Sequence, residues 1–136
     1  MAFITWTEEY VTGIASIDDQ HRHLVDLVNK FEEASRRGRG SRVMSDILND
    51  LVGYTQEHFS HEERIMAESG FPATASHIAL HRQLLQKVER FQHEFELEGQ
   101  RVTEEVRDLL RYWITNHILQ DDMAYARHVQ EALVTA

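Results

Sequence analysis

The feature that most constrains this chain is a set of long segments in which apolar residues recur every three or four positions and glycine or proline is rare. That spacing is typical of amphipathic helices, because it places the apolar side chains on one face. The breaks fall near Gly38 and Gly40, at Gly70 with Pro72, and near Gly99. No stretch as long as a β-strand shows strict alternation of apolar and polar residues. We therefore predict helices over 17–36, 41–69, 73–97 and 103–131.

Four amphipathic helices joined by short connections are expected to pack as an antiparallel up-down-up-down four-helix bundle. The 136 residues are the size of one domain, so we expect a single all-α domain over 1–136. Residues 1–16 show no clean period, and we predict that they form an extended arm packed on the bundle.

Composition excludes several classes of function. The chain has no cysteine, so it cannot contain a disulfide, a thiolate nucleophile or an iron–sulfur cluster. The formal net charge of −9 disfavours nucleic acid and anionic lipid as partners. The N-terminus lacks the pattern of a signal peptide, and no apolar run approaches the ~18 residues of a membrane span. We therefore expect a cytoplasmic monomer with no membrane insertion.

Nine histidines are unusually many for this length, and five of them lie on the apolar faces of the predicted helices. A lone histidine on such a face is usually an ordinary core residue. Two carboxylates lie on the same faces, where unpaired charges would be costly. The inward set comprises His21, His58, Glu62, His77, His81, His117 and Asp122. This combination predicts a metal site inside the bundle.

Spacing within the helices makes this site more specific. His77 and His81 are four residues apart, as are His58 and Glu62, so each pair shares a helix face. His117 and Asp122 are five apart and differ by about 140° on a regular helix, which predicts that they serve different edges of the site. Imidazole and carboxylate ligands suit iron, copper, zinc or manganese. Seven ligands exceed the needs of one tetrahedral ion, so two ions are favoured.

Two other metal motifs can be excluded. Carboxylate-rich di-iron bundles use Glu-x-x-His pairs, and no glutamate in this chain has a histidine three residues later. The zinc-protease pattern His-Glu-x-x-His begins at His61 but fails at Ile65.

The full pattern resembles the hemerythrin family, and its single-domain bacterial form in particular. The matching elements are His21, His58-x-x-x-Glu62, His77-x-x-x-His81 and His117-x-x-x-x-Asp122. Supporting matches are Trp6, the turn at Thr12–Ile14, the run Ile17–His21, and the residues around Phe59, Glu63 and Met66. The resemblance implies two irons with an oxo or hydroxo bridge. It places His77, His81 and His117 on one iron, His21 and His58 on the other, and Glu62 and Asp122 as bridges.

The resemblance further implies that the iron with two histidines has one open position, where dioxygen would bind. The family's oxygen pocket matches Phe59, Trp113, Ile114 and Ile118, which are equally compatible with ordinary core packing. We expect a non-enzymatic protein that carries, stores or delivers dioxygen, with an oxygen-consuming enzyme as the recipient. The alternatives are a di-iron enzyme or a sensor that handles peroxide, nitric oxide or oxygen at the same site.

The remaining charged and titratable groups have simpler expected roles. We expect His23, His93 and His128 to be solvated, and His61 to lie at the surface or behind a ligand. The arginines between Arg36 and Arg42 are expected to form a solvated loop.

Overall fold

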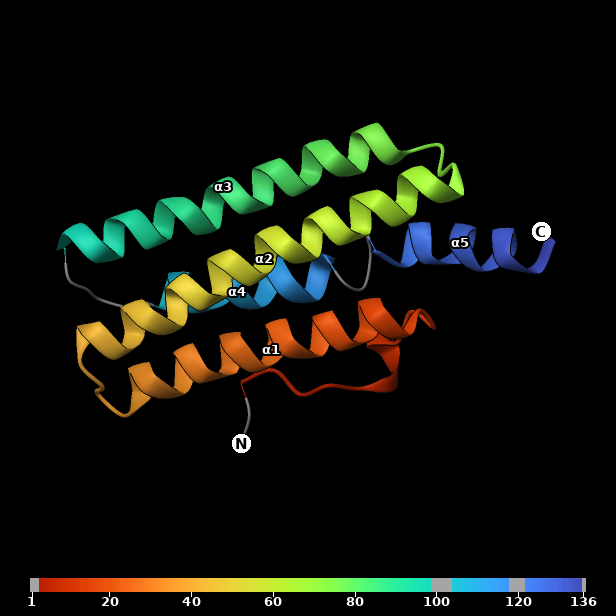
Figure 1. Ribbon diagram of the computed structural model, residues 1–136. Helices are drawn as coiled ribbons and strands as arrows, with labels where there is room; N and C mark the ends of the chain where they lie inside the picture. Colours follow the sequence, from red (N-terminus) through yellow and green to blue (C-terminus); the bar gives the residue numbers. More distant parts are fainter. Residues whose placement is uncertain (1–2, 99–103, 118–121, 136) are drawn as a thin grey trace.

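The chain folds into an antiparallel helical bundle, seen in a computed structural model that describes residues 3–98, 104–117 and 122–135. The elements are the 3₁₀ turn η1 (Glu8–Tyr10) and the helices α1 (Ala15–Arg36), α2 (Ser41–Ser69), α3 (Thr74–Glu98), α4 (Glu104–Asn116) and α5 (Met123–Thr135). Successive helices run in opposite directions, and α5 continues in the direction of α4 (Figure 1). α2 packs against α1, α3 and α5, and α1 packs against α4. The all-α bundle is confirmed.

Helix ends lie close to the positions predicted from glycine and proline. α2 ends at Ser69 because Gly70 takes a left-handed conformation (φ +71°), and the Phe71 amide donates to the Met66 carbonyl at 3.0 Å. This is a common glycine-terminated helix end. α3 begins and ends one residue later than predicted, and α1 begins at Ala15 instead of residue 17.

The segment predicted as one helix over 103–131 is not α-helical throughout its described residues. α4 ends at Asn116 and α5 begins at Met123, while His117 and Asp122 have π-helical geometry. A π turn carries an i→i+5 repeat and is frequent at functional sites. Apolar spacing does not reveal such a change, because the apolar residues of α4 and α5 follow the same spacing.

The N-terminal arm is fastened to the bundle by polar contacts near both of its ends. The Ile4 amide donates to Asn29 Oδ1 at 2.8 Å, and Asn29 Nδ2 donates to the Ile4 carbonyl at 2.9 Å. Asp18 Oδ1 accepts hydrogen bonds from the Thr12 amide (2.8 Å) and hydroxyl (2.7 Å). The predicted arm therefore packs on the bundle, although η1 and the first turn of α1 shorten its extended part.

Apolar residues form two groups along the bundle axis. The larger group contains Phe31, Leu48, Phe91 and Trp113, and the smaller contains Met66, Tyr125 and Val129. The inward histidines and carboxylates lie in sequence between members of the two groups. On α2, for example, Glu62 lies between Phe59 and Met66. The polar centre is therefore embedded between two apolar layers.

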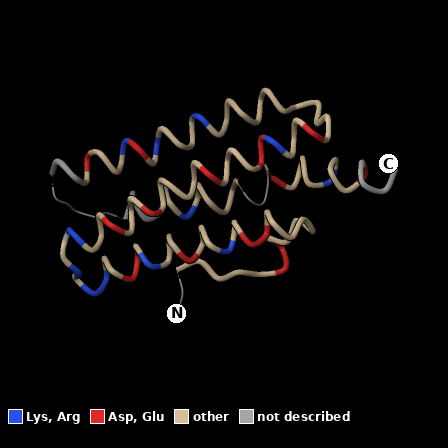
Figure 2. The backbone as a smooth tube through the Cα atoms, in the orientation of Figure 1, with Lys and Arg blue, Asp and Glu red and all other residues tan. Residues whose placement is uncertain are grey.

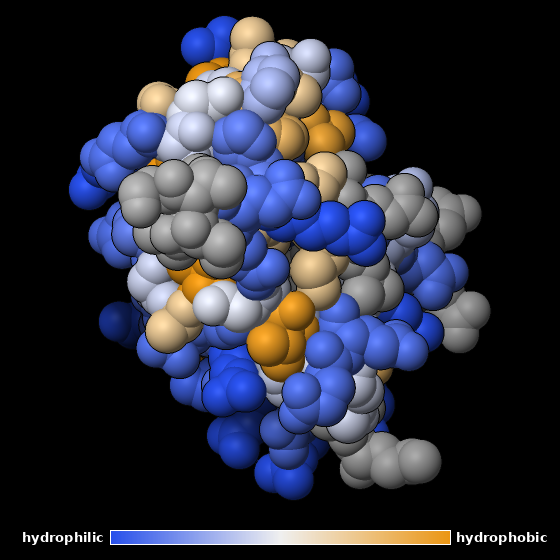
Figure 3. Space-filling view, turned by 90° about the vertical axis from the view of Figure 1, so that its right-hand side faces the viewer, coloured by the Kyte–Doolittle hydropathy of each residue, from blue (hydrophilic) through white to orange (hydrophobic). Residues whose placement is uncertain are grey.

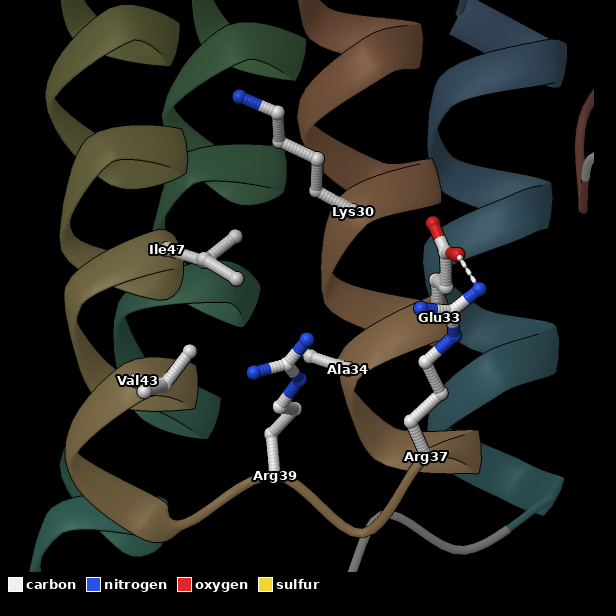
Figure 4. Close-up of a pocket in the computed structure, with 7 residues that line it drawn as sticks. All are labelled: Lys30, Glu33, Ala34, Arg37, Arg39, Val43 and Ile47. Carbon is white, nitrogen blue, oxygen red and sulfur yellow. Dashed lines mark ion pairs between the residues drawn. The ribbon is translucent and has the colours of Figure 1, made fainter.

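Basic residues gather at the connection between α1 and α2 (Figure 2). Arg36, Arg37, Arg39 and Arg42 are all exposed, as predicted, although only Arg37 and Arg39 lie in the connection, since Arg36 is the last residue of α1 and Arg42 belongs to the first turn of α2. Arg37 Nη2 lies 3.0 Å from Glu33 Oε1 beside a hollow of about 240 Å³ (Figure 4).

The opposite end of the bundle contains the connection between α2 and α3. Hydrophilic side chains cover most of its described surface, and apolar ones form small separate patches (Figure 3). Within the described ranges, no helix is both long and apolar enough to cross a membrane.

Candidate metal centre

The structure brings all seven inward side chains together in the interior. Their exposed fractions range from 0% to 6%, with both carboxylates at 0%. His21 comes from α1, the pair His58 and Glu62 from α2, the pair His77 and His81 from α3, and His117 and Asp122 from the π-helical residues between α4 and α5. All four helical segments of the bundle therefore contribute ligands to one centre.

The side chains divide into two overlapping groups, each with ligand atoms within 4.8 Å of one another. One group is His21, His58, Glu62, His117 and Asp122, and the other is His77, His81, His117 and Asp122. Two overlapping groups are what a pair of adjacent ions with shared ligands requires.

Asp122 faces imidazoles of both groups through its two oxygens. Oδ2 lies 2.6 Å from Nε2 of His21 and 3.0 Å from Nε2 of His117. Oδ1 lies 3.1 Å from Nε2 of His77. A carboxylate with this arrangement can bridge two cations.

Glu62 occupies the corresponding place on α2. Its Oε1 lies 2.7 Å from Nε2 of His58, 3.3 Å from Nε2 of His117 and 3.6 Å from Nε2 of His81. Its Oε2 lies 4.0 Å from Nε2 of His21 and accepts a hydrogen bond from the hydroxyl of Tyr125. Glu62 therefore also contacts imidazoles of both groups.

His117 and Asp122 meet directly, so the prediction that they serve different edges of the site is wrong. That prediction assumed α-helical winding, in which residues five apart diverge. Both residues instead have π-helical geometry, so the α-helical angle of that prediction does not apply to them.

Unpaired ring nitrogens indicate that a cation fits between these side chains. Nε2 of His58 and Nε2 of His81 are buried and make no hydrogen bond to any described residue. Both nevertheless lie near Oε1 of Glu62 (2.7 and 3.6 Å), so they face the carboxylate without donating to it. Buried polar atoms are nearly always satisfied. The mixture of imidazole nitrogens and carboxylate oxygens suits iron, zinc, copper or manganese.

In the metal-free centre, imidazoles and carboxylates have the protonation states that bind a cation. Burial lowers the pKa of His58, and it lowers the pKa of His81 to about 3, so these imidazoles are neutral. Burial and Asp122 act to raise the pKa of Glu62, but imidazole contacts, among them the hydrogen bond that Nε2 of His117 donates to its Oε1, outweigh them and lower the pKa to about 2. Burial likewise acts against ionisation of Asp122, but contacts with His117 lower its pKa well below the usual range. Neutral imidazoles and ionised carboxylates are the forms that coordinate metal.

Three residues behind the predicted ligands have roles that the sequence analysis did not assign. Nδ1 of His58 donates to Oε1 of Gln20 at 2.7 Å, and Nδ1 of His81 donates to Oε2 of Glu63 at 3.0 Å. Tyr125 donates to Glu62, and its pKa is raised by burial and by that carboxylate. Gln20 and Glu63 were part of the family match, but their contacts cross between helices, which spacing within one helix does not show.

Three of the four predicted pocket residues lie in the described structure, and all three are buried. The Phe59 ring stacks on the imidazole of His81 (centroids 3.9 Å apart, planes at 3°) and meets His117 edge-on at 5.1 Å. Trp113 and Ile114 belong to the same apolar cluster as Phe59. Ile118 lies outside the described residues.

The other histidines are separate from this centre. His23 and His93 are exposed, as predicted. His61 is half-buried, and its Nε2 lies 3.0 Å from the Ser16 hydroxyl. The prediction that His128 is solvated is wrong. It is half-buried and donates from Nε2 to the Ser69 carbonyl at 2.9 Å, because α5 packs against the end of α2.

Comparison with known proteins gives a consistent result. Residues 12–129 match the model of the hemerythrin HHE cation binding domain. A bacteriohemerythrin of Stenotrophomonas maltophilia is 33% identical over 133 residues, covering 98% of this chain and 86% of the relative. A bacteriohemerythrin of Methylococcus capsulatus is 32% identical over 126 residues, covering 92% and 95%. The crystal structure of wild-type hemerythrin superposes with a TM-score of 0.86 at 30% identity, covering 94% of this chain and 98% of that one.

Proposed function

This chain belongs to the hemerythrin family, and from that premise we propose that it is a non-haem di-iron protein that binds dioxygen reversibly. The observation that carries the proposal is the burial of five imidazoles and two ionised carboxylates around one centre, with ring nitrogens that lack hydrogen bonds to described residues. Oxygen carriage, storage or delivery is the role that this chemistry serves, and an oxygen-consuming enzyme is the class of partner that would receive the oxygen.

The two overlapping groups support a division of ligands between the irons. His77, His81 and His117 would hold one iron, and His21 and His58 the other. Glu62 and Asp122 would bridge them, since each carboxylate contacts imidazoles of both groups. When bound, a pair of ferrous ions supplies the two electrons that dioxygen accepts on binding.

The chain's own residues would then have two tasks. Neutral imidazoles contribute less negative charge than a carboxylate-rich set, which favours binding of oxygen over cleavage of its O–O bond. Phe59, Trp113 and Ile114 would form an apolar wall that keeps water and proton donors away from bound oxygen. Exclusion of water is what separates a reversible carrier from an oxidase.

The test is an oxygen titration of anaerobically reduced protein followed by absorbance. The proposal predicts saturation at one dioxygen per chain and return of the original spectrum when oxygen is removed. Continuous consumption of reductant with peroxide or water as product would instead assign the centre to an enzyme.

A further inference from the structure

Two imidazoles of the centre turn their second ring nitrogen toward chemically different partners. His58 on α2 donates from Nδ1 to the side-chain amide oxygen of Gln20 on α1 at 2.7 Å. His81 on α3 donates from Nδ1 to the carboxylate of Glu63 on α2 at 3.0 Å. Both acceptors fix the proton on Nδ1, so each imidazole presents a bare Nε2 to the centre. The two partners differ in charge, because an amide is neutral and a carboxylate is not.

The neutral and the charged acceptor lie behind ligands of different metal positions. His58 belongs to one group of ligand atoms and His81 to the other. A hydrogen bond to a charged acceptor is roughly twice as strong as one between neutral groups. A carboxylate behind a ligating histidine also raises the basicity of that ligand. His81 should therefore be a stronger donor to a cation than His58.

We propose that Glu63 is a positioning residue that makes the two metal positions unequal, so that the position at His77, His81 and His117 fills first and binds more tightly. The inference rests on the proposed two-ion function, because it concerns the order in which the two positions fill. Glu63 is 30% exposed, so its carboxylate stands at the edge of the centre and acts through His81.

Two other features act in the same direction and must be separated from Glu63. The favoured position has three imidazoles and the other has two. The ring of Phe59 also stacks on His81 and restricts its orientation without contributing charge. Exchanging the acceptors by Glu63→Gln and Gln20→Glu leaves both features in place, so this pair of variants isolates the charge of the acceptor.

The experiment is a titration of metal-free protein with Zn²⁺ as the probe. Native mass spectrometry counts the ions per chain, calorimetry gives the two affinities, and imidazole ¹⁵N shifts show which histidines respond at each step. We expect His77 and His81 to respond first in the parent. Glu63→Gln should weaken the first step about 10-fold to 100-fold and leave the second unchanged. Gln20→Glu should raise the affinity of the second step and so reduce the difference between the two Zn²⁺ affinities.

Two further variants control for loss of charge and loss of fold. Glu57→Gln removes an exposed carboxylate from the same helix and should change neither step by more than a small factor. Glu63→Asp keeps the charge and should retain a first-step affinity nearer to that of the parent. Equal effects of Glu63→Gln and Glu57→Gln, or a first response at His21 and His58, would overturn the inference. A parent that binds one Zn²⁺ in total would instead contradict the two-ion function itself.

Discussion

The hydroxyl of Tyr125 donates a hydrogen bond to Oε2 of Glu62 inside the bundle, where both residues have an exposed fraction of 0%. The other oxygen of that carboxylate lies 2.7 Å from Nε2 of His58. Tyr125 also contacts His77 edge-on, with ring centroids 5.4 Å apart. One side chain of α5 therefore donates to a carboxylate of α2 and packs against an imidazole of α3. These two contacts connect α5 to the metal centre.

Replacement of Tyr125 by Phe should lower the free energy of unfolding by about 1–3 kcal/mol, because the buried oxygen of Glu62 loses its phenol donor. The imidazoles and carboxylates stay in place, so metal content should remain that of the parent. Denaturant unfolding and elemental analysis measure the two quantities.

The matched control is Tyr112→Phe, which removes the same hydroxyl from a side chain that is 65% exposed. It should change stability by less than about 0.5 kcal/mol. If the two variants were equally stable, the bond between Tyr125 and Glu62 would contribute nothing to the fold.

The sequence predicted the parts of this centre that depend on regular helical spacing. His77 and His81, four residues apart, meet as expected, and Gly70 ends its helix where the glycine signal placed it. The direct contact of His117 with Asp122 was missed because it depends on π-helical geometry, which has no simple signature in the apolar pattern.

Cross-helix contacts were the second class that sequence could not supply. Tyr125 is buried beside apolar residues of α5, and nothing in its position along the chain indicates the carboxylate that it contacts. Gln20 and Glu63 are next to predicted ligands in the chain, yet each binds a histidine of another helix. Such pairs depend on the relative rotation of packed helices, which spacing within one helix does not determine.

Removal of the metal should lower the melting temperature by several degrees or more. Without a cation, Glu62 and Asp122 are two buried carboxylates in one centre, and ligand binding to the folded state adds directly to its stability. Thermal unfolding before and after chelation measures the effect. Identical midpoints would show that metal binding is not coupled to the stability of the bundle.

The metal-free protein should become less stable as pH falls from about 7 to about 4. Burial lowers the pKa of His58, and it lowers that of His81 from its ordinary 6.5 to about 3. Below pH 6.5 these histidines therefore bind protons in the unfolded chain but not in the folded chain, and this difference favours unfolding. The lowered pKa values of Glu62 and Asp122 extend the same trend to more acidic pH. Urea midpoints across this range provide the measurement, and a midpoint that rose on acidification would contradict the assigned charge states.

Replacement of Ile114 by Ala tests the apolar wall. Ile114 is 1% exposed, so the truncation should cost on the order of 2–5 kcal/mol if the cavity does not close. The oxygenated protein should also lose its oxygen faster and irreversibly, with peroxide released, because water gains access to the centre. Absorbance decay under air and a peroxide assay follow this loss.

Leu48→Ala provides the comparison for Ile114→Ala, because Leu48 is as buried as Ile114 and belongs to the same apolar group, but it lies ten residues before His58 on α2 and so away from the centre. It should cost similar stability and leave the oxygenated lifetime unchanged. An unchanged lifetime in Ile114→Ala as well would make that residue ordinary core.

The central claim is that seven buried side chains hold two iron ions, and counting the ions in each chain tests it most directly. Protein from iron-replete cells, purified without chelators, should contain two irons per chain by elemental analysis, with zinc, copper and manganese at trace levels. One metal per chain, or a content that is chiefly zinc, would contradict the account.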